Sequence, residues 1–408
     1  MRGCAKDDTG YLPLNVEKPP ARADAWPGQS WGFGTFFFSY YGFVGIFPPY
    51  VTLFFAYRGM SAVDIGILMS IAQAMRIVGP NLWGWIADVW QKRTRVLQLV
   101  AVLSCLSFIG IFFGTTFLQF AVIMIVLNLF TSGQGPLSDA IMLAEMRGNL
   151  TRYGQLRLWG SIGYIVMTAS VGWFLDQYGI VWMPWVGLLV LGVVCLISFF
   201  LYDTPQSAPV REDIPFIRLL CRKDVLAFLV SAFFMLAAHS ALYAFYSLYL
   251  RKLGYSHVMV GIMWALGATA EILFFIYQSS VFRRFGLKWV MIASLALAVV
   301  RFLLIGCGGE SFLILLFAQI LHAATFGAHH SASILTLQRW FSGARQARGQ
   351  AMFISVSYGL GCTLGGLFLS FVWGWWGAET VYLIASGFAL LGLLAAIFSY
   401  RWQNGTLA

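Results

Sequence analysis

Charged residues are scarce in this 408-residue chain: Asp, Glu, Lys and Arg supply 10% of it, whereas soluble domains carry about 25%. Hydrophobic residues supply 60%, and apolar runs long enough to cross a bilayer recur along the sequence. A soluble globular protein is therefore excluded. The sequence predicts an all-α polytopic membrane protein.

Several enzyme and metal motifs are missing from the sequence. It has neither a GxxxxGK[ST] loop nor a GxSxG elbow, which argues against an ATP-driven pump and a serine hydrolase. None of the six cysteines forms a CxxC pair, so a disulfide framework or a metal site is not expected. We therefore expect no enzyme activity, no metal and no cofactor.

Twelve stretches are predicted to be transmembrane helices, because each is close to the ~20 residues that span a bilayer core. They are 31–57, 62–89, 95–113, 115–146, 151–174, 181–202, 223–250, 257–283, 287–306, 311–340, 346–374 and 378–400. The longest internal polar loop separates the sixth from the seventh. The expected organisation is an N-terminal tail, a six-helix bundle, a linker, a second six-helix bundle and a C-terminal tail, over 1–30, 31–202, 203–222, 223–401 and 402–408.

The net charge of +10 is unevenly distributed along the chain. Alternate predicted loops hold most of the Lys and Arg residues, while the opposite loops hold only Arg58, Arg251 and Lys252. Cytoplasmic loops carry the basic excess in membrane proteins, so we predict both termini in the cytoplasm and the protein in the inner membrane. The expected partners are protons, a small-molecule substrate and the lipid bilayer, not nucleic acid, and we expect a monomer.

Two opposite charges are expected to meet inside the membrane. Asp139 lies nine residues before Gly148 and Arg157 nine residues after it, so antiparallel helices joined at Gly148 would carry both about 13 Å from the turn. An ionisable group within the membrane is costly unless it is paired or faces water. We interpret the pair as part of a substrate site. The alternative is a structural ion pair that only joins two helices.

Each of these charges belongs to a polar stripe at helical spacing, which indicates one polar helix face. The two stripes are Asn128, Ser132, Gly135 and Asp139, and Arg157, Ser161, Tyr164 and Thr168. A polar face inside a membrane is expected to line a cavity or a buried interface. Ser161 and Tyr164 are therefore candidate substrate contacts.

The second half carries ionisable groups of its own. Glu271 lies mid-span, with Trp264 on the same helical face, and Tyr243 lies on the span before it. The tenth span carries a stripe of polar and aromatic residues: Gln319, His322, Phe326, His329, Ser333 and Thr336. A carboxylate near an imidazole can load and release protons, so Glu271 and His322 are candidate proton-coupling groups. We interpret His239, His329 and His330 as hydrogen-bonded core residues.

The stretch GWIADVWQKR, residues 84–93, resembles the loop 2–3 signature of the major facilitator superfamily. The matching residues are Gly84, Asp88, Lys92 and Arg93. Val89 and Gln91 stand where the family prefers a basic residue and a glycine. The stretch RRFGLK, residues 283–288, is the equivalent loop of the second half. It keeps a glycine, Gly286, and the basic residues, but has Arg283 at the Asp position. The resemblance implies two six-helix bundles around a central cavity, with Asp88 and the basic residues as a conformational latch.

The stretch YGQLRLWGSIGYI resembles the fifth span of lactose permease and its relatives, in which an acid and an arginine bind substrate and an aromatic residue stacks on it. Tyr164 takes that aromatic position here. Most of the chain resembles the 3-phenylpropionic acid transporter group, as in AMRIVG around Arg76, ATAEILFF and QILHAATF. The resemblance implies that Glu271 and His322 share substrate binding and proton coupling. Thr325 replaces the acid that carries the proton in lactose permease, so that role falls to Glu271, Asp139 or His322.

Charge and aromatic content indicate the class of substrate. The expected cavity sets two acids, Asp139 and Glu271, against Arg76, Arg157 and Arg301. A buried cation without a partner is costly, so a carboxylate ligand would complete the site. Nearby aromatic residues, Tyr243 and Trp264 included, favour a ring on that ligand.

The sequence as a whole predicts a secondary active transporter that carries a small organic acid with a proton by alternating access. Arg76, Asp139, Arg157, Ser161, Tyr164, Tyr243 and Trp264 are its candidate substrate-binding residues. Two alternatives remain open, a nucleoside or sugar symporter and a drug/proton efflux antiporter. A membrane enzyme that uses His329 or His330 as a general base is disfavoured.

Overall fold

The computed structural model describes residues 30–146, 150–202, 222–341 and 345–405, and these residues are almost entirely helical. The first half of the chain, residues 30–202, contains six α-helices: α1 (Ser30–Tyr57), α2 (Ala62–Trp90), α3 (Arg93–Phe113), α4 (Phe117–Glu145), α5 (Leu150–Tyr178) and α6 (Met183–Ser198). Most of the predicted linker and most of the predicted N-terminal tail lie outside the described residues.

The second half, residues 222–405, contains longer and more interrupted helices. They are α8 (Lys223–Lys252), α9 (His257–Gly308), α10 (Phe312–Ile320), α11 (His329–Trp340), α12 (Arg345–Ile354), α13 (Cys362–Trp376) and α14 (Ala378–Gly405). Two π-helical segments, η2 (Ala323–Ala328) and η3 (Ser355–Gly361), join α10 to α11 and α12 to α13. The last helix reaches Gly405, so the predicted C-terminal bundle extends four residues beyond its expected end at 401.

Ten helices in the described ranges are long and apolar enough to cross a membrane. One of the ten, α9, has 52 residues and contains the predicted spans 257–283 and 287–306, which meet at Gly286. Gly286 interrupts the helix because its backbone has φ 73° and ψ 156°, a conformation open essentially to glycine alone. The 28-residue α1, which contains Pro48 and Pro49, is not among the ten.

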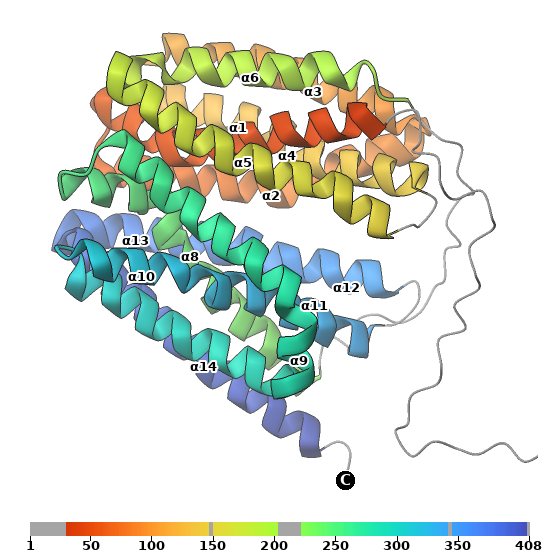
Figure 1. Cartoon of the computed structure of the whole chain (residues 1–408), viewed down its shortest axis with the longest axis vertical. Coiled ribbons are helices and arrows are strands. Elements are labelled where there is room, and N and C mark those ends of the chain that lie inside the picture. The colour runs from red at the N-terminus through yellow and green to blue at the C-terminus, as the bar shows by residue number, and fades with distance from the viewer. Residues whose placement is uncertain (1–29, 147–149, 203–221, 342–344, 406–408) are drawn as a thin grey trace, which may run out of the picture.

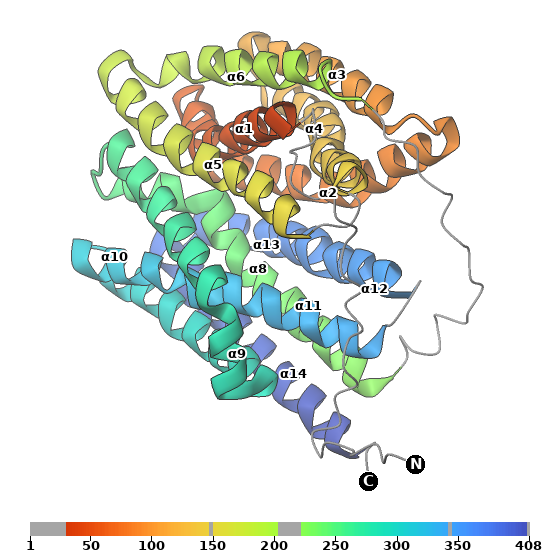
Figure 2. The same cartoon turned by 45° about the vertical axis from the view of Figure 1, so that its right-hand side comes forward.

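The helices of each half pack mainly with one another, as Figures 1 and 2 show in red to yellow-green for α1–α6 and in green to blue for α8–α14. In the first half α1 packs on α5 and α6, and α4 packs on α2 and α3. In the second half α14 packs on α8 and α9. The two halves meet chiefly where α5 touches α9 and where α2 touches α13.

The antiparallel helices give the molecule two ends. We call the end where α1 begins and α14 finishes the tail end, and the opposite end the far end. The turns between α1 and α2, between α8 and α9, and between α13 and α14 lie at the far end. The ribbons of the two halves approach each other there and diverge toward the tail end (Figure 1).

The loop between α2 and α3 turns at Gln91, the position where the loop signature prefers a glycine. Gln91 ends α2 in the left-handed region with φ 53°, and it is the one residue other than glycine with positive φ among the described residues. Its side-chain amide donates a hydrogen bond to the carbonyl of Asp88 at 2.5 Å. The matching loop of the second half places Gly286, also with positive φ, at the break of α9. Both loops therefore turn at a residue with positive φ. That residue is glycine in the second loop and glutamine in the first.

Candidate functional site

Asp139 and Arg157 lie side by side on α4 and α5. Arg157 Nε is 3.8 Å from Asp139 Oδ1, and each side chain is 31% exposed. Tyr153, one turn before Arg157 on α5, donates its hydroxyl to the same carboxylate oxygen at 3.2 Å. The carboxylate thus has two partners from α5. The distance of 3.8 Å is longer than a hydrogen bond, so the guanidinium keeps donors for a further group.

The guanidinium of Arg157 also rests on an aromatic surface from α1. Its central carbon lies 3.8 Å from the ring centroid of Tyr41 and 5.6 Å from that of Phe37. Gly160 makes this approach possible, because a Cβ there would lie 2.6 Å from the Tyr41 ring and 2.8 Å from Arg157 Nη1. Such cation–π contacts contribute about 0.5–2 kcal/mol. They hold the planar guanidinium in one orientation.

A second cluster surrounds Arg301, which is 1% exposed. Its Nε donates to the carbonyl of Ala318 at 2.7 Å, its Nη2 to Gln319 Oε1 at 2.7 Å, and its Nη1 to Thr325 Oγ1 at 3.1 Å. Nη1 also lies 3.0 Å from His322 Nδ1. A buried arginine is stable only when its donors are satisfied, and these four contacts come from a single segment, residues 318–325.

The contact with Arg301 determines the tautomer of His322. An arginine can only donate, so His322 Nδ1 must accept and the ring proton of a neutral imidazole is on Nε2. Nε2 faces Glu271, whose Oε2 is 3.8 Å away. The two side chains are 15% and 20% exposed. Arg301 therefore positions His322 so that its one N–H points at the carboxylate.

The aromatic stripe of the tenth span differs from the predicted one. We expected His329 to follow Phe326 on the same face, but the π-helix η2 widens the turn and brings His330 into line instead. The rings of His322 and Phe326 are stacked at 5.1 Å, and those of Phe326 and His330 at 6.5 Å, each pair 11° from parallel. His329 is 2% exposed within the core. His330 Nδ1 lies 3.1 Å from the hydroxyl of Tyr358 on η3.

The two clusters face each other across the two halves. Glu271 of the second half interacts electrostatically with Arg157 and Tyr164 of the first half. Arg76, exposed on α2, interacts in the same way with Tyr243 on α8 and with Tyr358. The charges predicted for both halves thus act on one shared region.

The remaining predicted substrate contacts are distributed around this region. Ser161 and Tyr164 are half-buried on α5, one and two turns after Arg157. Trp264 donates its indole N–H to Ser247 Oγ at 3.0 Å and packs edge-on against Tyr246. Its polar atom is therefore already bonded within the protein, which leaves mainly its ring for a ligand.

The predicted latch residues lie at the tail end, around the turn between α2 and α3. Asp88 is exposed, and Arg93 Nη2 is 3.8 Å from its Oδ1. Lys92 is exposed, and a Cβ on Gly84 would meet open space. The ion pair joins two residues of the same half.

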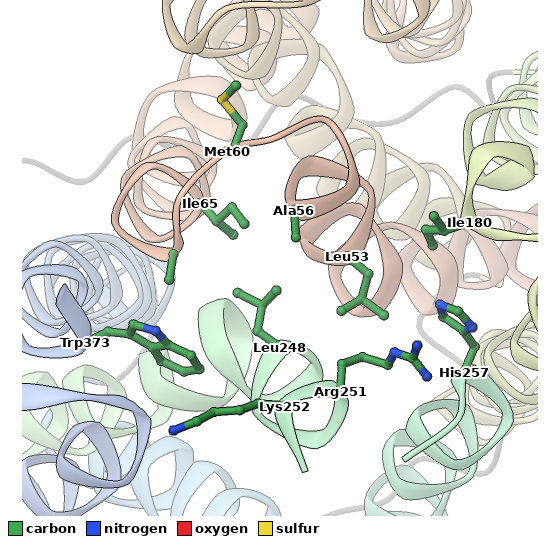
Figure 3. A pocket seen from close by; sticks show the side chains of 11 residues that line it. Leu53, Ala56, Met60, Ile65, Ile180, Leu248, Arg251, Lys252, His257 and Trp373 are labelled. Carbon is green, nitrogen blue, oxygen red and sulfur yellow. The ribbon is translucent and has the colours of Figure 1, made fainter. Parts of the chain in front are cut away.

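A cavity of about 510 Å³ lies at the far end, apart from the predicted site (Figure 3). Residues from both halves line it: Leu53, Ala56, Met60, Ala62, Ile65, Ile180, Leu248, Arg251, Lys252, His257 and Trp373. Its walls are mostly apolar, and Arg251, Lys252 and His257 are its polar members. The cavity marks a place where the two halves come together without filling the space between them.

Some residues at the site were not predicted. Tyr153 could have been found, because it lies one helical turn before Arg157 on the same face. Tyr41 and Phe37 could not, because α1 reaches Arg157 only through tertiary packing. The role of Arg301 in orienting His322 likewise depends on the approach of α9 to η2, which has no local signal.

The long apolar helices, with a pair of opposite charges on α4 and α5, define a multi-pass membrane protein. The sequence matches the MFS_1-like family over residues 30–384, and the chain belongs to that family. It is therefore a transporter of the major facilitator superfamily. The family and its relatives are transporters rather than enzymes.

Two curated relatives align along almost the whole chain. The chain is 28% identical to the probable 3-phenylpropionic acid transporter of Escherichia coli (strain K12) over 87% of this chain and 93% of that protein. It is 24% identical to the maltose permease of Geobacillus stearothermophilus over 89% and 92%. The crystal structure of the nucleoside transporter NupG has the same fold, with a TM-score of 0.82 at 18% identity over 92% of this chain and 99% of that one.

Proposed function

We propose that the protein is a proton-coupled symporter that imports a small organic acid, preferably an aromatic one, by alternating access. In this proposal the chain crosses the inner membrane twelve times with both termini in the cytoplasm, and it acts as a monomer without a cofactor. The observation that carries the proposal is a pair of ionisable side chains inside each half, Asp139 with Arg157 and Glu271 with His322, on helices that meet where α5 packs against α9. A substrate bound there touches both halves and can therefore couple their movement.

The substrate class follows from the partners of Arg157. Asp139 lies 3.8 Å away and already accepts a hydrogen bond from Tyr153, so the guanidinium can still offer its planar fork to a second carboxylate. Tyr41 beneath it provides an aromatic surface. The 28% identity to a probable 3-phenylpropionic acid transporter supports an aromatic acid. The shared fold with NupG favours a nucleoside as the second candidate.

Proton coupling is assigned to Glu271 together with His322. The carboxylate lies 3.8 Å from His322 Nε2 and is 20% exposed, so it is shielded from water yet can be reached by it. A proton on Glu271 removes the charge that faces Arg157. Loss of that negative charge favours the binding of an anionic substrate at Arg157, and this gives an ordered mechanism in which the proton binds first.

The proposal is tested with purified protein in two steps. A thermal-shift screen of aromatic acids, nucleosides and disaccharides identifies the ligand, because a ligand that binds the folded state raises its melting temperature. Proteoliposomes then report uptake with and without an inward proton gradient. Stabilisation by aromatic acids and gradient-driven uptake are expected. Stabilisation by nucleosides alone would replace the proposed substrate class.

Glu271→Gln separates coupling from binding. The variant is expected to exchange internal for external substrate but to accumulate none under a pH gradient, because glutamine cannot carry the proton. Glu310→Gln is the matched control, since Glu310 is an exposed acid in the turn at the far end. Normal accumulation by Glu271→Gln would remove Glu271 from the proton pathway.

A further inference from the structure

One carboxylate from the first half holds the start of a helix in the second half. Asp176, near the end of α5, accepts three hydrogen bonds from the first two residues of α9. The backbone N–H of His257 donates to Oδ1 at 2.8 Å, the backbone N–H of Val258 to Oδ2 at 2.8 Å, and His257 Nδ1 to Oδ1 at 2.7 Å. Both carboxylate oxygens are thus occupied by the opposite half.

These bonds complete the capping of α9. The first backbone N–H groups of any helix lack partners within the helix. Ser256, the N-cap residue, accepts the N–H of Met259 through its hydroxyl at 3.2 Å. The N–H groups of His257 and Val258 remain, and Asp176 accepts them from another part of the chain. A negative charge at a helix N-terminus is further favoured by the helix dipole.

The surrounding surface is shaped for close contact between α5 and α9. A Cβ on Gly172 of α5 would lie 2.6 Å from the carbonyl oxygen of His257, and a Cβ on Gly261 of α9 would lie 2.5 Å from that of Thr168. Small residues at such positions let two helix backbones touch. Tyr50 of α1, fully buried, donates its hydroxyl to the carbonyl of Thr168 beside them.

We infer that Asp176 is a reversible clamp that holds the far end of the transporter closed, and that these three bonds break each time the far end opens. The inference rests on the proposed alternating access, in which the halves separate at one end at a time. We call Asp176, His257 and Val258 the clamp. Asp176 is a positioning residue, because it acts on the relation of the halves and not on the substrate.

The location of the clamp suits a bond that must break repeatedly. The side chains of Asp176 and His257 are 20% and 14% exposed, so water can replace each partner when the halves separate. Hydrogen bonds exchanged for water have a small net free energy. A carboxylate clamp at this largely buried but water-accessible position stabilises the closed end without making its opening prohibitive.

The test measures closure of the far end at a second contact, away from the clamp. Ser70 of α2 and Gly366 of α13 face each other across the halves, with 3.7 Å between the Ser70 Cβ and a Cβ built on Gly366. This spacing suits a disulfide. The double variant Ser70→Cys, Gly366→Cys is treated with an oxidant, and the linked peptide is followed by mass spectrometry. The assay needs neither substrate nor proton gradient, so it reports even if the proposed function fails.

Adding Asp176→Ala is expected to slow crosslinking about tenfold, because the far end then spends less time closed. His257→Ala removes only one of the three bonds and is expected to slow it less. Asp64→Ala is the matched control. Asp64 is an acid at the same end that caps its own helix α2 by accepting from Ser61 in the same half. It should leave the crosslinking rate unchanged.

Hydrogen exchange at His257 and Val258 separates a clamp from a local cap. Asp176→Ala should speed exchange of these two amides whichever role Asp176 has. Crosslinking at the unaltered rate despite faster exchange would overturn the inference and leave Asp176 as a cap alone. If Asp176→Ala does not fold, Asp176→Asn retains one carbonyl acceptor, and the same comparison of crosslinking with exchange decides the question.

Discussion

At the scale of single residues, Arg157 combines an aromatic contact and an ion pair with a planar set of donors that a lysine lacks. The central carbon of its guanidinium lies 3.8 Å from the ring centroid of Tyr41, its Nε lies 3.8 Å from Asp139, and it retains donors for a ligand. A lysine has a compact charge without the fork geometry. The side chain is therefore suited to bind a carboxylate in one orientation.

Arg157→Lys and Asp139→Asn are each expected to abolish detectable substrate binding, with a loss of affinity of 30-fold or more, about 2 kcal/mol. The lysine loses the bidentate contact, and the asparagine removes the charge that holds the guanidinium in place. The measurement is the ligand-induced thermal shift. Arg95→Lys, at an exposed arginine of α3, is the control and should bind normally. Unchanged binding by Arg157→Lys would show that the pair is structural.

The sequence predicts part of this site and misses the rest for a physical reason. Asp139 and Arg157 flank one turn, so their depths follow from counting residues along two antiparallel helices. Tyr41 and Arg301 act through helices that are distant in sequence, and helical periodicity has no information on which remote helix comes near. Contacts between two helices joined by one turn can therefore be predicted from the sequence, whereas contacts between helices distant in the sequence cannot.

At the scale of elements, the helices of the second half depart from regular α-geometry where the site is built. The π-helical segment η2 carries Phe326, and η3 carries Tyr358, whose ring lies edge-on to that of Phe326 at 6.1 Å. A π-helix is often found at a functional site. Because it adds a residue to a turn, it moves the following side chains around the axis, and this is why His330 and not His329 aligns with His322. A prediction that assumes regular α-helical spacing along the sequence cannot detect that shift.

The break in α9 depends on one glycine. Gly286→Ala is expected to destabilise the protein by about 1–3 kcal/mol, since an alanine is strained at φ 73° and ψ 156°. A Cβ there would meet no atom within 4 Å, so the loss comes from the backbone alone. Gly387→Ala is the control, because Gly387 lies within α14 and also has open space around its Cα. Thermal unfolding should place Gly286→Ala below the original protein and Gly387→Ala at or above it.

At the scale of the whole molecule, the two halves are held together at the far end by contacts of different kinds. The α5–α9 contact carries the clamp, and the α2–α13 contact joins small residues such as Ser70 and Gly366. The cavity between His257 and Trp373 lies between these contacts (Figure 3). Closure at this end therefore rests on these two strips of surface together with the contact of α1 with α8.

Oxidation of the double variant Ser70→Cys, Gly366→Cys is expected to stop transport, and a reducing agent is expected to restore it. The disulfide would join α2 to α13 and keep the far end closed, so that substrate could no longer enter there. Uptake by proteoliposomes measures the effect. Gly366→Cys alone is the control for the substitution. Continued uptake by the fully crosslinked protein would contradict a mechanism in which the halves separate at the far end.

The family and the division into apolar helices could be inferred from the sequence, because hydropathy and the loop signature are local properties. The Asp176 clamp could not, because it depends on how the two halves dock. Asp176 and His257 belong to different halves and are 81 residues apart. No composition, spacing or periodicity relates them.

The clamp places a constraint on α9 that a side-chain comparison would overlook. Two of its three donors are main-chain amides, so the identity of residues 257 and 258 matters less than their having an N–H. Helices ordinarily accept proline at their first position, but a proline at 257 or 258 would delete a donor that Asp176 requires. We therefore expect that transporters with an acid at the end of the fifth span in this arrangement lack proline at the first two positions of the eighth span.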